Sequence, residues 1–101
     1  MRKSKFKKWW YGHVSGLIRD YSKFENEDTE MANEIREAMR KTVIETANTF
    51  PDWPDRYKAI SCICFRGLSM DDTAKELFYS KRTVTRWWNR FVYDVGKNLG
   101  F

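Results

Sequence analysis

The sequence predicts an all-α protein with five helices, and three observations support this fold class. Apolar residues recur every three or four positions along most of the chain, which is the spacing of a helical stripe. Capping residues such as serine and aspartate precede these stripes, and glycine or proline follows them. No segment is convincing as a strand. The 101 residues fit a single domain, with an N-terminal helical extension over 1–50 and a second unit over 51–101.

Two helices are expected in the N-terminal half. The first runs from Ser4 to about Phe24, with an apolar stripe at Phe6, Trp10, Val14, Leu17 and Tyr21. The second runs from Asn26 to about Asn48, and Asn26 or Asp28 is expected to cap its start. Its stripe is Ala32, Ile35, Met39, Val43 and Thr46, and its acidic first turns suit the positive end of the helix dipole.

A third helix follows the segment FPDWPD, whose two prolines end the second helix. Pro54 is expected as its first residue, and it reaches Phe65. The buried positions predicted for it are Tyr57, Ile60, Ile63 and Cys64. Gly67 then ends this helical region.

Two further helices complete the chain. Ser69 caps a short fourth helix that reaches Phe78, with Thr73, Ala74 and Leu77 facing inward. Ser80 caps a fifth helix from Lys81 to about Val95, with an apolar edge of Val84, Trp87, Phe91 and Val95. A short helix, a tight turn and a longer basic helix make up a helix-turn-helix pattern.

This pattern carries side chains suited to duplex DNA. Outward positions of the fifth helix are Lys81, Arg82, Thr85, Arg86 and Asn89. Arginine donates two bonds to guanine, asparagine pairs with adenine, and lysine neutralises phosphate. Amides at the start of the fourth helix would touch a phosphate. The predicted DNA-binding residues are therefore Ser69, Ser80, Lys81, Arg82, Thr83, Thr85, Arg86, Asn89 and Arg90.

Charge is distributed unevenly along the chain. The net charge of +5 divides into +6 over residues 1–24, −4 over 25–50, −1 over 51–79 and +4 over 80–101. Basic ends favour a polyanionic partner. The lysines of the first segment, Lys3, Lys5, Lys7 and Lys8, are either a solvated helix end or an arm that contacts phosphates. The acidic second helix is either a solvated face or a contact for a basic partner.

The segment GLSMDDTAKELFYSKRTV resembles the helix-turn-helix of sigma-factor region four and of LuxR-type response regulators. The matching residues are Gly67, Leu68, Ser69, Ala74, Leu77, Ser80, Thr83 and Val84. The whole chain is also similar to the RinA/ArpU-like group of phage late-gene regulators, whose N-terminal turn matches residues 17–21. That similarity implies activation of a phage late promoter, with bacterial RNA polymerase as a partner, in the cytoplasm of the host.

One departure from these families is the pair Trp87 and Trp88, which is bulkier than their aliphatic pattern. Adjacent helical positions point about 100° apart, so the two rings face different neighbours. We expect Trp87 in the core. Trp88 is expected either on the N-terminal helices or against DNA backbone.

The sequence lacks the residue patterns of an enzyme or of a cofactor site. It has no glycine-rich phosphate loop, no metal-ligand spacing and no nucleophile with a candidate base. Cys62 and Cys64 point roughly 200° apart on a helix, so no metal site with His13 is expected. The thiols are expected to be reduced, and we expect neither a secretion signal nor a membrane span.

These observations predict a sequence-specific regulator of transcription that binds double-stranded DNA and is not an enzyme. RNA polymerase and a second copy of the chain are further candidate partners. Two alternatives remain open. One is a small phage DNA-packaging subunit that recognises the packaging site. The other is a protein-interaction module that binds RNA polymerase without contacting DNA.

Overall fold

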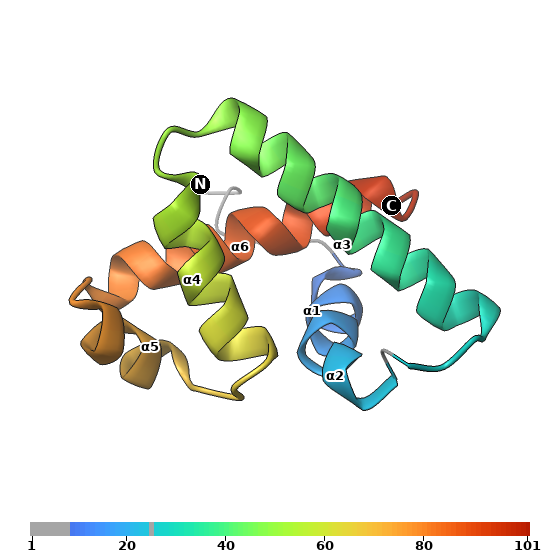
Figure 1. The fold of residues 1–101 in the computed structure, drawn as a ribbon, viewed down its shortest axis with the longest axis horizontal. Coiled ribbons are helices and arrows are strands. Elements are labelled where there is room, and N and C mark those ends of the chain that lie inside the picture. The colour runs from blue at the N-terminus through green and yellow to red at the C-terminus, as the bar shows by residue number, and fades with distance from the viewer. Residues whose placement is uncertain (1–8, 25) are drawn as a thin grey trace.

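The fold is taken from a computed structural model, in which residues 9–24 and 26–101 are described (Figure 1). Its helices are α1 Tyr11–Arg19, α2 Tyr21–Phe24, α3 Glu30–Thr49, α4 Trp53–Cys64, α5 Met70–Leu77 and α6 Lys81–Asn98. No strand occurs within those two ranges. The predicted all-α fold class is therefore confirmed.

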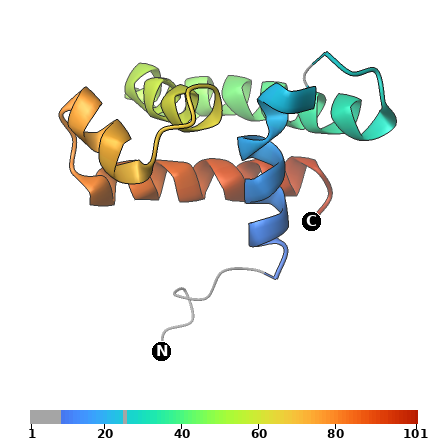
Figure 2. The ribbon, with the colours of Figure 1, turned by 90° about the horizontal axis from the view of Figure 1, so that it is seen from below.

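The C-terminal helix α6 is the centre of the fold. It contacts α1, α3, α4 and α5. Figure 2 shows α3 and α4 together on one side of α6, with α5 at the N-terminal end of α6 and α1 crossing its C-terminal half.

One apolar core joins the two halves of the chain. Its largest fully buried side chains come from α1, α3, α4 and α6 and include Trp88, Ile18, Ile35, Ile63, Val14, Val84, Val92 and Val95. Ala74 of α5 belongs to the same cluster, and its small side chain lets α5 pack closely on α6. The helix-turn-helix is therefore held in place by α1 and α3 as well as by α4.

The N-terminal helix differs from the prediction. Instead of one helix to Phe24, α1 ends at Arg19 and α2 follows after a break at Asp20, whose amide donates to the Gly16 carbonyl at 2.9 Å. The buried residues of α1 are Tyr11, Val14 and Ile18, whereas the predicted Leu17 is only half-buried. The break places the ring of Tyr21 edge-on to that of Phe65, with centroids 6.2 Å apart. The predicted positions Ser4 and Phe6 lie outside the described residues.

Helix α3 begins later than predicted. Thr29 is its cap rather than Asn26 or Asp28, since the Thr29 hydroxyl accepts from the amide of Ala32 at 3.1 Å. The Asp28 carboxylate instead accepts from the side-chain amide of Asn33 at 3.1 Å. Ala32, Ile35 and Met39 are buried as expected, together with Ala38 and Thr42, while the predicted Val43 and Thr46 are half-buried.

Helix α4 follows the prediction in its position but not in every buried residue. It begins at Trp53, so Pro54 is its second residue, and it ends one residue before Phe65. Ile60, Ile63 and Cys64 are buried as predicted. Tyr57 is exposed, which corrects the prediction, because its ring lies beside that of Trp53 (5.0 Å between centroids) at the edge of α4.

The helix caps and turn residues of the helix-turn-helix match the sequence prediction closely. Gly67 adopts a left-handed conformation (φ +69°) after α4. The Ser69 hydroxyl accepts from the amide of Asp72 at 3.0 Å, and the Ser80 hydroxyl accepts from the amide of Thr83 at 3.1 Å. The end of α5 is corrected, because Phe78 lies outside the helix at φ +61° with its side chain 93% exposed. Helix α6 continues to Asn98, beyond the predicted Val95.

Gly96 is a position where only glycine fits. A Cβ at Gly96 would lie less than 3 Å from the indole of Trp10, which crosses α6 there. We expect Gly96→Ala to lower the free energy of unfolding by about 1–3 kcal/mol through overpacking, despite the better helix propensity of alanine. Gly16→Ala, where a Cβ meets nothing within 4 Å, should instead raise stability by roughly 0.5–1 kcal/mol. Urea denaturation of both variants checks this, and changes of the same sign would contradict it.

Two buried threonines provide a second test of the packing. The Thr73 hydroxyl is fully buried and finds no hydrogen-bond partner within the described structure. The Thr42 hydroxyl donates to the Ala38 carbonyl at 2.7 Å and accepts from the Asn98 side chain at 2.8 Å. Thr73→Val should therefore stabilise the fold by about 1 kcal/mol, whereas Thr42→Val should destabilise it by about 1–3 kcal/mol. Thermal unfolding of the two variants distinguishes these outcomes, and destabilisation by Thr73→Val would contradict the expectation.

Candidate nucleic-acid interface

The first turns of α6 carry an exposed basic surface. Arg82 and Arg86 lie one helical turn apart, are exposed, and form no ion pair with any residue that the structure describes. Lys81 is also exposed, and its Nζ lies 3.5 Å from Oδ1 of Asp71 on α5. No acidic residue occurs in the first turn of α6, so the positive end of its dipole adds to the charge of these side chains.

The predicted hydroxyl residues take part in capping. Ser80 Oγ accepts from the amide of Thr83 and donates to Thr83 Oγ1 at 2.9 Å. Ser69 caps α5 in the same way. Thr85 is half-buried on α6. The hydroxyls of Ser69 and Ser80 fix the starts of α5 and α6, so the basic side chains project from a defined helix end.

Asn89 is placed at the boundary between the basic surface and α1. The hydroxyl of Tyr11 donates to Asn89 Oδ1, and the Asn89 side chain is half-buried. Burial of the Tyr11 phenol, aided by the neighbouring Tyr93, raises the pKa of Tyr11, so the phenol stays a donor across the physiological range. The carbonyl of Asn89 is therefore occupied by an intramolecular bond.

Both tryptophans of the pair are buried, on different sides of α6. The Trp87 ring lies edge-on to Tyr79, with centroids 4.8 Å apart, and so fills the helix-turn-helix wedge. Trp88 is 2% exposed, and the guanidinium of Arg19 on α1 lies 5.1 Å from its ring. The prediction that Trp87 lies in the core is confirmed, and of the two sites expected for Trp88 the structure shows the N-terminal helices.

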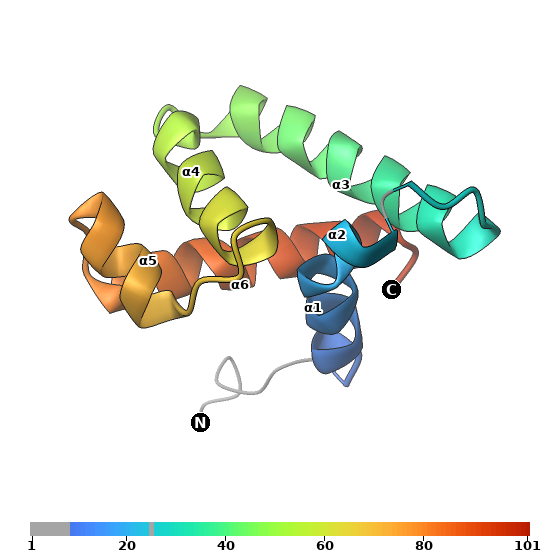
Figure 3. The ribbon, with the colours of Figure 1, turned by 60° about the horizontal axis from the view of Figure 1, so that its bottom comes forward.

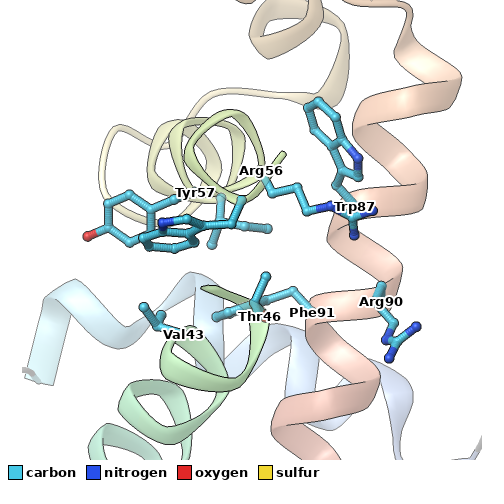
Figure 4. A pocket seen from close by; sticks show the side chains of 9 residues that line it. Val43, Thr46, Arg56, Tyr57, Trp87, Arg90 and Phe91 are labelled. Carbon is cyan, nitrogen blue, oxygen red and sulfur yellow. The ribbon is translucent and has the colours of Figure 1, made fainter. Parts of the chain in front are cut away.

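Arg90 of α6, a predicted DNA-binding residue, belongs to a cluster whose other members, Phe50, Asp52 and Arg56, are not predicted as site residues from the sequence. Arg56 of α4 has its guanidinium 3.7 Å from the ring of Phe50, and the guanidinium of Arg90 lies 5.1 Å from the same ring. Arg56 Nε bonds Asp52 Oδ1 at 2.8 Å, and Arg90 Nε bonds Asp94 Oδ2 at 2.9 Å. Figure 4 shows Arg56 reaching from α4 toward Trp87 of α6. The segment FPDWPD was interpreted only as a helix stop, although its aromatic and acidic residues are the signal for this cluster.

The structure does not bring the histidine and the cysteines together. Cys64 Sγ donates to the Ile18 carbonyl at 3.0 Å, Cys62 is buried in α4, and His13 faces the ring of Phe101. Across the described ranges, no three His, Cys, Asp or Glu side chains cluster as metal ligands would. None of the helices described has the length and apolar character needed to cross a membrane.

Comparison with known families settles which family this helix-turn-helix represents. The sequence model of the ECF sigma factor family matches residues 14–92. The chain belongs to this family. The matched range extends from α1 into α6, so α5, α6 and the capped turn between them are part of the ECF sigma factor region. No curated protein and no solved structure matches the chain.

Membership of the ECF sigma factor family has consequences for function. The family consists of regulatory DNA-binding proteins and is not a family of enzymes. It indicates that this chain interacts with DNA and with RNA polymerase. The resemblance of the helix-turn-helix to sigma-factor region four is therefore confirmed, whereas the similarity to the RinA/ArpU-like group stays a prediction.

Proposed function

We propose that this ECF sigma factor domain reads a specific DNA sequence by placing the N-terminal half of α6 in the major groove. The observation that carries the proposal is the exposed pair Arg82 and Arg86, which lack ion-pair partners in the described structure and lie on the first turns of a capped helix. Guanidinium groups free of carboxylates are available to bind base edges or phosphates.

The arrangement of the helices supports this docking. Figure 3 shows the N-terminal end of α6 beside α5 at one end of the molecule, far from the crossing with α1. Lys81, Arg82 and Arg86 are exposed on this end of α6. The major groove of B-DNA, about 12 Å wide, admits one α-helix. Helix α5 then lies across the backbone, as the first helix of a helix-turn-helix does.

Individual roles follow from the contacts. Arg82 and Arg86 donate to base edges, with Thr85 between them. Lys81 leaves its ion pair with Asp71 and binds a phosphate of the DNA. The backbone amides of the first turn of α5, which follow Ser69, donate to a second phosphate. The side-chain NH2 of Asn89 is its free donor for a base, because its carbonyl oxygen already accepts from the Tyr11 hydroxyl. Lys3, Lys5, Lys7 and Lys8 lie outside the described residues, and we keep them in the proposal as a phosphate-contacting arm.

The similarity to RinA/ArpU-like regulators leads us to propose a more specific regulatory role, that of a phage late-gene activator. In this role, the chain binds a phage late promoter in the cytoplasm of a bacterial host and activates transcription together with RNA polymerase.

The second candidate function is that of a module that binds RNA polymerase without DNA, which the polymerase interaction of the family favours. Homodimer formation and a packaging role stay predictions. A mass measurement in solution tests both, because a packaging subunit would form a ring.

The base-reading role of Arg86 has a direct test. If Arg86 donates two bonds to guanine, Arg86→Gln should cost about 1–3 kcal/mol of binding on the preferred duplex and much less on an unrelated duplex. Fluorescence anisotropy with both duplexes at one salt concentration measures the two losses. Equal losses on the two sequences would mean that Arg86 holds only phosphate.

A further inference from the structure

We propose that the groove between α6 and the α3–α4 connection holds a phosphodiester of the DNA backbone, and that Asp52 weakens this contact in the native sequence. The inference rests on the proposed function, since it concerns the DNA that α6 binds. It adds Phe50, Asp52 and Arg56, which lie outside the helix-turn-helix, to the residues of α6 in one phosphate site. The groove is lined by Phe50, Asp52, Arg56, Thr83, Arg86, Trp87 and Arg90.

Three arginines from two helices converge on this groove. Arg56 comes from α4, and Arg86 and Arg90 come from successive turns of α6. The guanidinium groups of Arg56 and Arg90 lie over the ring of Phe50, at 3.7 and 5.1 Å from its centroid. Stacking on an aromatic ring holds a guanidinium plane while its edge donors remain able to bond an anion. The Arg56 side chain is only 19% exposed, so its position is fixed by packing.

The charge of the groove suits a phosphodiester. Among its lining residues, three arginines face the single carboxylate of Asp52. That carboxylate lies 2.8 Å from Arg56 Nε and its side chain is 44% exposed. Asp94, the partner of Arg90, does not line the groove. A phosphate entering the groove therefore meets a net positive charge. Asp52 is the carboxylate that it meets inside the groove, whereas Asp94 bonds Arg90 Nε from outside it.

The position of the groove points to a backbone phosphate rather than to a free anion. Arg86 belongs both to the groove and to the proposed reading face of α6. A helix lying in the major groove is flanked by phosphates on each side, and such contacts fix its register. Tyr11 of α1 contacts α6 at Asn89, whereas Arg86 and Arg90 on the neighbouring face of α6 open into this groove. A phosphate of the bound duplex would thus be held between α4 and α6.

The test is a gain of affinity, which misfolding does not produce. Asp52→Asn removes the carboxylate from the groove and should tighten binding to duplex DNA by about four- to tenfold at low salt, as expected for one charge near the surface. The matched control is Asp55→Asn, which also removes one negative charge. Asp55 lies one turn further along α4, accepts from the Tyr79 hydroxyl at 2.7 Å and does not line the groove. We expect less than a twofold change for it.

A second arm identifies the source of the phosphate. Duplexes carrying one neutral methylphosphonate at successive positions should show one position at which the gain from Asp52→Asn disappears. Equal gains of affinity for Asp52→Asn and Asp55→Asn would contradict a phosphate site in the groove. So would the absence of any methylphosphonate position at which the gain from Asp52→Asn disappears. Inorganic phosphate should leave the Arg56 Nε–H resonance unchanged at low millimolar concentration. A shift there without DNA would assign the groove to a free anion and contradict the inference. If the native chain binds no duplex at all, the proposed function fails and the inference fails with it.

Discussion

Charge reversal at both Arg82 and Arg86 should reduce binding to the preferred duplex by about a hundredfold or more, the largest functional effect expected for this chain. Each glutamate removes a donor and places a negative charge where we propose base edges and phosphates lie. Both side chains are exposed and form no ion pair with a described residue, so the fold should keep its stability. Anisotropy titrations with the labelled duplex measure the loss, and circular dichroism confirms that the helices remain.

The control for this variant has the same change in net charge. Lys41→Glu with Lys58→Glu also lowers the net charge from +5 to +1, at exposed positions on α3 and α4 outside the proposed interface. Its affinity should fall by less than about tenfold, through the general field of the protein. Comparable losses in the two double variants would contradict a specific role for α6. An unchanged affinity in the Arg82 and Arg86 variant would mean that the duplex is bound elsewhere on the chain. No binding by the native chain, with transcriptional function intact in the variant, would favour binding to RNA polymerase alone.

Trp88→Ala should cause the largest loss of stability, about 3–5 kcal/mol, because it empties a large volume at the centre of the core. The indole is 2% exposed, packs where α6 meets α1, and has the Arg19 guanidinium 5.1 Å from its ring. Domains of this size have a total stability of roughly 5–15 kcal/mol, so the variant should lose a large fraction of its stability and unfold at a clearly lower temperature. Denaturant unfolding followed by circular dichroism measures the change.

Trp9→Ala serves as the matched control for Trp88→Ala. Trp9 is 86% exposed, although its ring lies edge-on to that of Phe101 with centroids 5.7 Å apart. Its removal should change the free energy of unfolding by less than about 0.5 kcal/mol. Similar losses for the two tryptophans would mean that the core is not centred on α6 as described.

Much of the fold was predictable from local chemistry. The helix-turn-helix was located because its caps are local: Ser69 and Ser80 bond amides only three residues away. The break at Asp20 and the exposure of Tyr57 were not predictable in this way. The break accompanies packing between segments far apart in the sequence, Tyr21 with Phe65. The exposure of Tyr57 depends on which neighbours reach the edge of α4, where its ring lies beside Trp53. Periodicity alone does not identify which helix packs against the apolar face of another.

The candidate site was predictable only in part, for the same reason. Arg82 and Arg86 were identified because their exposure follows from the helical register of α6. The groove with Phe50, Asp52 and Arg56 depends on the return of the α3–α4 connection to the side of α6. The bond from Tyr11 to Asn89 links residues 78 positions apart. No local pattern marks either contact, although the cluster of aromatic and charged residues at 50–56 was visible.

The most direct test of sequence-specific DNA binding is selection of the native chain on random duplex DNA across a salt series, with sequencing of the retained pool. We expect one enriched motif, and binding that weakens steeply as salt rises because phosphate contacts release counterions. Retention with no enriched motif, or no salt-dependent retention, would contradict specific reading by α6.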